Sequence, residues 1–146
     1  MAIVREASVT WSGDLIGGNG TINQVTSKAI NGLPVSWAAR TEVPGGKTSP
    51  EELMAAAHAS CYAMAFSFGL GNAGSPPQKL EVSATVTFDK VGDGFKVVSS
   101  ALKVSGQVAG IDAAAFKEAA EAAKDGCPIS QALKGNVELS VEATLE

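Results

Sequence analysis

The chain has 146 residues, enough for one domain with a sizeable hydrophobic core but too few for two such domains. Hydrophobic residues make up 45% of the chain and charged residues 18%, a balance that excludes intrinsic disorder. The formal net charge is −4 and the only arginines are Arg5 and Arg40, so we expect no surface suited to a nucleic-acid backbone. We interpret residues 1–146 as a single domain.

Residues 3–40 contain β-type segments separated by turn signals. We predict strands over residues 3–11, 21–25 and 33–40, with a glycine-rich turn at 17–20. A loop rich in glycine and threonine, residues 43–48, then leads into a helix.

The start of that helix is clearly marked. Ser49 can cap it, Pro50 suits the first helical position, and Glu52 completes a capping box with Ser49. Residues 53–70 carry no formal charge, so a membrane span has to be considered. Because this stretch is rich in alanine, serine and glycine and contains His58, we expect a buried central helix and no membrane partner. The N-terminus lacks the pattern of a secretory signal, and we expect a soluble, cytoplasmic protein.

The second half of the chain predicts a strand pair, two helices and a last strand. Apolar and polar residues alternate over 80–89, a glycine-rich turn follows at 92–94, and a partner strand runs over about 95–104. Asp112 can cap a helix that Gly126 ends, Cys127 can cap a short helix over 129–134, and residues 136–145 alternate again. This order predicts an α+β fold with antiparallel sheet. One chain of this size would not cover so apolar a central helix, and we therefore expect a homodimer.

The two cysteines are Cys61 and Cys127, 66 positions apart. In a reducing cytosol such a pair is either two buried small side chains or a redox couple. Cys61 lies more than two turns inside its helix, so the helix dipole would stabilise its thiolate only slightly. A lowered pKa of Cys61 would therefore need a cation from another part of the protein. Cys127 lies at a predicted helix N-cap, where the dipole would stabilise a thiolate, although it could equally be a cysteine that follows a glycine stop.

Three further residues are candidates, and each has an ordinary alternative. Arg40 precedes the loop that leads into the long helix, and its guanidinium could stabilise a thiolate with Glu51 as its carboxylate partner. Arg40 could also be a surface residue, and Glu51 a common first-turn acid. His58 shares a helix face with Cys61, so it could activate the thiol, bind zinc with the cysteines, or be a core histidine with satisfied hydrogen bonds.

Two long segments resemble the cysteine motifs of the OsmC/Ohr family of organic hydroperoxide reductases. Residues 47–61, KTSPEELMAAAHASC, are similar to the first motif, and residues 126–134, GCPISQALK, to the second. Residues 11–14 and 110–112 also fit, so the resemblance covers essentially the whole chain. It implies an OsmC-like intertwined homodimer, with antiparallel sheets around two long central buried helices and active sites that draw residues from both subunits.

The resemblance also implies roles for individual residues. Cys61 matches the peroxidatic cysteine, Cys127 the resolving cysteine, and Glu51 the motif glutamate. Arg40 falls where the osmotically inducible (OsmC) branch places its arginine. Ser49 departs from the pattern because the family usually has asparagine there, and either residue can cap a helix.

The expected activity is therefore the reduction of organic hydroperoxides, and more weakly hydrogen peroxide, to alcohols. A Cys61 sulfenic acid would condense with Cys127 to a disulfide, which a dithiol of the lipoyl type or a small thiol would reduce. No metal, flavin or haem is expected because sulfur does the chemistry. The alternatives are a non-enzymatic redox-sensing or ligand-binding dimer with reactive cysteines, and a structural dimer with inert thiols.

Overall fold

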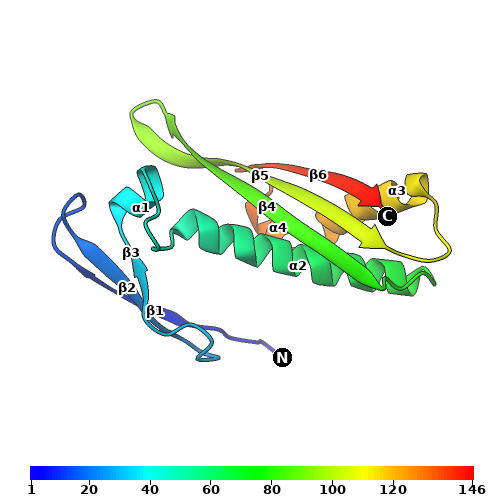
Figure 1. The fold of residues 1–146 in the computed structure, drawn as a ribbon, viewed down its shortest axis with the longest axis horizontal. Coiled ribbons are helices and arrows are strands. Elements are labelled where there is room, and N and C mark those ends of the chain that lie inside the picture. The colour runs from blue at the N-terminus through cyan, green and yellow to red at the C-terminus, as the bar shows by residue number, and fades with distance from the viewer. The chain divides into compact units, whose positions relative to one another are not determined.

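The structure is a computed structural model of residues 1–146, and the chain consists of two units, Met1–Leu53 and Met54–Glu146 (Figure 1). The expectation that both belong to one OsmC-like domain stays a prediction.

The first unit is built on a small antiparallel sheet of order β1-β2-β3. Its strands are β1 (Ala7–Ser12), β2 (Asn19–Val25) and β3 (Leu33–Val35). The predicted strand over 33–40 is correct only for its first residues, because α1 (Trp37–Thr41) follows. The Ser36 hydroxyl accepts a hydrogen bond from the Ala39 N–H at 3.1 Å and so caps this helix. Arg40 therefore lies on a short helix and not at the end of a strand.

The long helix α2 (Pro50–Asn72) begins where the sequence predicts. The Ser49 hydroxyl accepts a hydrogen bond from the Glu52 N–H at 3.2 Å, which is one half of the expected capping box. The other half, a hydrogen bond from the Ser49 N–H to the Glu52 carboxylate, is not formed. The Glu52 carboxylate accepts a hydrogen bond from the Thr48 hydroxyl at 3.3 Å instead. The cap thus fixes the start of the helix that carries His58 and Cys61.

The second unit contains a three-stranded sheet of order β4-β5-β6. Its strands are β4 (Lys79–Val91), β5 (Gly94–Gln107) and β6 (Glu138–Leu145). Strands β4 and β5 form the predicted antiparallel hairpin, whereas β6 pairs with β5 in parallel, so this antiparallel-rich sheet also contains one parallel pair. The reason is a helical crossover between them, α3 (Ala113–Gly126) and α4 (Pro128–Leu133), which returns the chain to the same end of the sheet.

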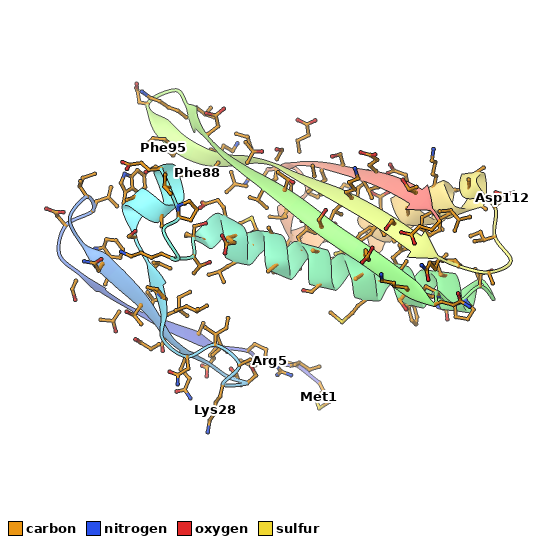
Figure 2. All side chains as sticks on the ribbon, in the orientation of Figure 1. Met1, Arg5, Lys28, Phe88, Phe95 and Asp112 are labelled. Atoms are coloured by element: carbon orange, nitrogen blue, oxygen red, sulfur yellow. The ribbon has the colours of Figure 1, made fainter.

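Both crossover helices start as predicted. Asp112 lies at the start of α3 (Figure 2). Its carboxylate accepts a hydrogen bond from the Ala115 N–H at 2.8 Å and so caps the helix. Cys127 is the N-cap of α4, with Pro128 at the first helical position, but its side chain makes no capping hydrogen bond. The Cys127 sulfur is therefore available for other contacts.

The core of the second unit lies between α2, the sheet and α3. On α2 the fully or almost fully buried side chains recur every four residues, as one helical face requires: His58, Tyr62, Phe66 and Leu70. The Phe66 and Phe116 rings are 5.1 Å apart, which joins α2 to α3, and Leu102 and Val104 of β5 belong to the same cluster. Along β4 the predicted alternation is present, with half-buried and exposed residues in turn.

The opposite side of α2 is not covered within the second unit. Met64 and Phe68 are 68% and 73% exposed, so only one face of the expected central helix is buried. By length and composition α2 could cross a membrane, a criterion that the core helix of a soluble protein also meets. We call Met64, Ser67 and Phe68 the open face of α2.

Candidate active site

The fold brings the two cysteines together. Cys61 lies near the middle of α2 and Cys127 at the start of α4, and their side chains are within hydrogen-bonding distance of each other. Both are free thiols. Cys127 is completely buried whereas Cys61 is only partly buried, so a solute can approach Cys61 more easily.

The two thiols differ in their surroundings. Burial raises the pKa of Cys61; the Ile129 backbone N–H opposes this without offsetting it, and the neighbouring Cys127 raises the pKa further. Burial alone would also raise the pKa of Cys127. Its pKa is nevertheless below the ordinary value, because the thiolate is stabilised by the backbone N–H groups of Ser130 and Ile129 and by the side chains of Cys61 and Ser130. The start of α4 thus stabilises the Cys127 thiolate, as the N-cap position predicts.

His58 is completely buried and uses both ring nitrogens. Its Nδ1 lies 2.7 Å from the Ser100 hydroxyl oxygen of β5, and its Nε2 lies 2.8 Å from the Ser130 hydroxyl oxygen of α4. Burial lowers the pKa of His58. This is the arrangement of a core histidine with satisfied hydrogen bonds, the third of the alternatives for this residue. No group of three or more His, Cys, Asp and Glu side chains is arranged to hold a metal ion.

Sequence reasoning did not single out Ser100 and Ser130. A signal was present for each residue. Ser100 occupies an inward position of β5, in step with the buried Leu102 and Val104, and Ser130 lies one helical turn after Cys127. A polar residue at an inward strand position indicates a buried hydrogen-bond partner.

Arg40 and Glu51 form an ion pair within the first unit. Arg40 Nε and Nη2 both donate to Glu51 Oε1, at 2.9 and 2.7 Å, and Nε also lies 3.1 Å from Oε2. Glu51 is only 8% exposed, and the guanidinium lies 5.8 Å from the centroid of the Trp37 ring. The pair orients a fixed positive charge, as expected from the two residues. Its action on Cys61 stays a prediction.

Comparison with known proteins identifies the family. Residues 43–142 match the family described as OsmC-like protein. The chain is also 41% identical to the peroxiredoxin OsmC of Escherichia coli strain K12 over 142 residues, which are 97% of this chain and 98% of the relative. The chain belongs to the OsmC family. The peroxiredoxin OsmC of Shigella flexneri matches this OsmC-family chain with the same identity and coverage.

Solved structures agree with the OsmC assignment. The organic hydroperoxide resistance protein OhrB of Bacillus subtilis has a TM-score of 0.72 and 25% identity, covering 95% of this chain and 98% of its own. An organic hydroperoxide resistance protein OsmC from Legionella pneumophila has a TM-score of 0.74 and 20% identity, covering 99% of each chain, and so shows the fold alone. The predicted OsmC-like α+β fold is confirmed. The 41% identity to OsmC proteins places the chain on the OsmC branch of the family.

Proposed function

We propose that this OsmC-family chain is a cysteine-based peroxidase that reduces organic hydroperoxides, and more weakly hydrogen peroxide. The observation that carries the proposal is the contact between the two thiols, which places a second sulfur beside the first wherever oxidation begins. The names of its relatives, peroxiredoxin OsmC and organic hydroperoxide resistance protein OhrB, support a peroxidase-type activity.

The reaction has two steps. In the first, the Cys61 thiolate attacks the distal oxygen of the hydroperoxide; the O–O bond breaks, the alkoxide leaves and takes a proton from water to become the alcohol, and Cys61 becomes a sulfenic acid. In the second, the Cys127 thiolate attacks the Cys61 sulfur; a disulfide forms, the S–O bond breaks, and hydroxide leaves to become water. An external dithiol of the lipoyl type, or small thiols, then reduces the disulfide.

Cys61 is the better candidate for the first step because it is the more accessible sulfur. Cys127 is completely buried, so a peroxide cannot reach it without a local opening. The pKa directions oppose this order within one chain, since the Cys61 pKa is raised and the Cys127 pKa is lowered. A cation beside Cys61 would reverse them, and this is the role that we assign to Arg40.

We assign Glu51 the role of holding the Arg40 guanidinium in place. Glu51 and Cys61 are ten positions apart on α2, which corresponds to about 15 Å of helical rise. A guanidinium held on Glu51 is therefore expected to serve the Cys61 thiolate of a second subunit. The proposed active site thus requires a homodimer.

The open face of α2 supports this dimer. Met64 and Phe68 lie beside a groove of about 530 Å³ whose other walls come from β4 and the residues before it. Monomeric proteins rarely leave large apolar side chains adjacent to one another in water, and a second copy of α2 would cover them. The same apolar surroundings favour organic peroxides over hydrogen peroxide. Because the disulfide formed in each turnover has to be reduced again, we propose a location in the reducing cytoplasm.

The test compares Cys61→Ser and Cys127→Ser proteins with the wild type, using cumene hydroperoxide and dithiothreitol. Wild type should turn over many times, Cys61→Ser should lose activity, and Cys127→Ser should form a sulfenic acid on Cys61 that dimedone traps. Hydrogen peroxide should be the poorer substrate. Full activity of Cys61→Ser, or a dimedone adduct on Cys127, would contradict the proposal. A single oxidation without turnover would favour the redox-sensing alternative.

A further inference from the structure

His58, Ser100 and Ser130 form a buried hydrogen-bonded group that the proposed chemistry does not use. The three residues come from α2, β5 and α4 and are at most 2% exposed. The two His58 ring nitrogens lie 2.7 and 2.8 Å from the serine oxygens, and no buried side-chain nitrogen or oxygen atom lacks a partner. The group leads towards the active site, because Ser130 lies one turn after Cys127 at the start of α4, where its side chain interacts with the Cys127 thiol.

The number of available protons determines which atom donates in each hydrogen bond of this group. Burial lowers the pKa of His58, so at neutral pH the imidazole carries one N–H donor and one acceptor nitrogen. One serine must therefore donate to the ring and the other must accept from it. In its thiolate form the Cys127 sulfur has no proton and can only accept a hydrogen bond, so a Ser130 hydroxyl that interacts with it must donate its O–H to the sulfur.

A hydroxyl has a single proton. If Ser130 donates that proton to Cys127, its oxygen must accept the hydrogen bond from His58 Nε2–H. His58 Nδ1 then carries no proton and accepts from the Ser100 hydroxyl. All donors point the same way, from Ser100 through His58 and Ser130 to the sulfur.

We propose that His58 is a positioning residue for the second cysteine: its Nε2–H holds the oxygen of Ser130 so that the Ser130 proton points at the Cys127 sulfur. The inference rests on the proposed function in giving Cys127 the resolving role. Its consequence is selective. Loss of His58 should slow the attack of Cys127 on the Cys61 sulfenic acid and leave the formation of that sulfenic acid unchanged.

The first experiment needs no substitution. His58 is the only histidine, so nitrogen NMR of protein carrying isotope-labelled histidine reports this ring alone. We expect the tautomer with its proton on Nε2, unchanged as the pH falls below the ordinary histidine value. A proton on Nδ1 would reverse the chain of donors and overturn the proposal.

The second experiment titrates Cys127 in a Cys61→Ser background, through the ultraviolet absorbance of the thiolate. The only tyrosine, Tyr62, does not overlap this titration because burial raises its pKa. His58→Leu and Ser130→Ala should each shift the Cys127 midpoint upwards by about one pH unit. The double variant should shift it no further than Ser130→Ala alone, because His58 acts through Ser130. His58→Gln, which keeps a donor, should restore part of the shift.

Ser60→Ala is the matched control. The Ser60 hydroxyl is on the exposed side of α2 and donates only to the Ala57 carbonyl, so the Cys127 midpoint should not move. An unshifted midpoint in folded His58→Leu, or additive shifts in the double variant, would overturn the proposal. If His58→Leu does not fold by circular dichroism, His58→Gln and the tautomer decide. Because the titration needs no peroxide, a failed peroxidase assay leaves this result independent.

Discussion

At the scale of single residues, the charge on Arg40 carries the strongest prediction. Its guanidinium is held by Glu51 at 2.7 to 3.1 Å, and the Cys61 thiol that it should serve has a pKa raised by burial. In a Cys127→Ser background, Arg40→Ala should raise the Cys61 midpoint by about one pH unit. The thiolate is the reactive form, so the rising limb of the pH–rate profile should move to higher pH, and kcat/KM at neutral pH should fall about tenfold.

Two variants control for the charge itself. Arg40→Lys keeps a positive charge without the forked geometry and should have an intermediate effect. Lys103→Ala removes a positive charge from an exposed pair with Glu142, at 3.7 Å, and should leave the Cys61 midpoint in place. Equal midpoints in Arg40→Ala and wild type would show that the guanidinium does not act on this thiol.

Residue identities could be predicted from the sequence better than residue contacts. The candidate residues Cys61, Cys127, Arg40 and Glu51 could be named because their motifs are local features, and the structure pairs Arg40 with Glu51, while their catalytic roles stay predictions. The partners of His58 could not be named, because Ser100 and Ser130 are 42 and 72 positions away along the chain. Only the packing of α2 against β5 and α4 brings them together. The lowered pKa of the Cys127 thiol follows from its N-cap position, whereas the raised pKa of Cys61 depends on burial that appears only in the fold.

At the scale of elements, the packing of α3 on the sheet depends on Gly106 of β5. A Cβ atom at this position would lie 2.7 Å from Phe116 Cζ and 2.9 Å from Leu80 Cδ2. Phe116 is completely buried and packs against Phe66, so its ring has little room to move aside. We predict that Gly106→Ala lowers the free energy of unfolding by about 1–3 kcal/mol, measured by urea denaturation at fixed protein concentration.

Gly126, at the end of α3, provides the matched control for this substitution. Nothing lies within 4 Å of a Cβ atom built there, so Gly126→Ala should be neutral, or should stabilise the helix by up to about 1 kcal/mol. If both substitutions change the free energy of unfolding equally, close packing at Gly106 is not the cause of the change.

Two departures from the sequence-based expectations have physical causes. Residues 37–40 were predicted as the end of a strand, but Ser36 caps a helix there, and Ala38, Ala39 and Arg40 are strong helix formers. Strand β6 has the expected alternation, yet alternation reports which face is buried and not the direction of the neighbouring strand. The direction is set by the crossover through α3 and α4, a property of the fold and not of the strand sequence.

At the scale of the whole molecule, the absence of a polar face on α2 is the feature that a single chain does not explain. The prediction of a homodimer came from this composition, and the structure leaves Met64 and Phe68 exposed. Charge on an apolar surface that is buried in a complex is costly, because the ion must be desolvated. The open face of α2 therefore offers a direct test of the dimer that the proposed active site requires.

We predict that the wild-type protein sediments at twice its 14.8 kDa chain mass and that Phe68→Glu shifts it to the monomer. Peroxide turnover should fall with the dimer fraction, because Arg40 then no longer reaches the Cys61 thiolate of a second subunit. Ala114→Glu, which adds the same charge in the exposed first turn of α3, should change neither mass nor turnover. If a folded Phe68→Glu monomer keeps full activity, one chain is sufficient for catalysis. In that case a group other than the Arg40 guanidinium of a second subunit must stabilise the Cys61 thiolate.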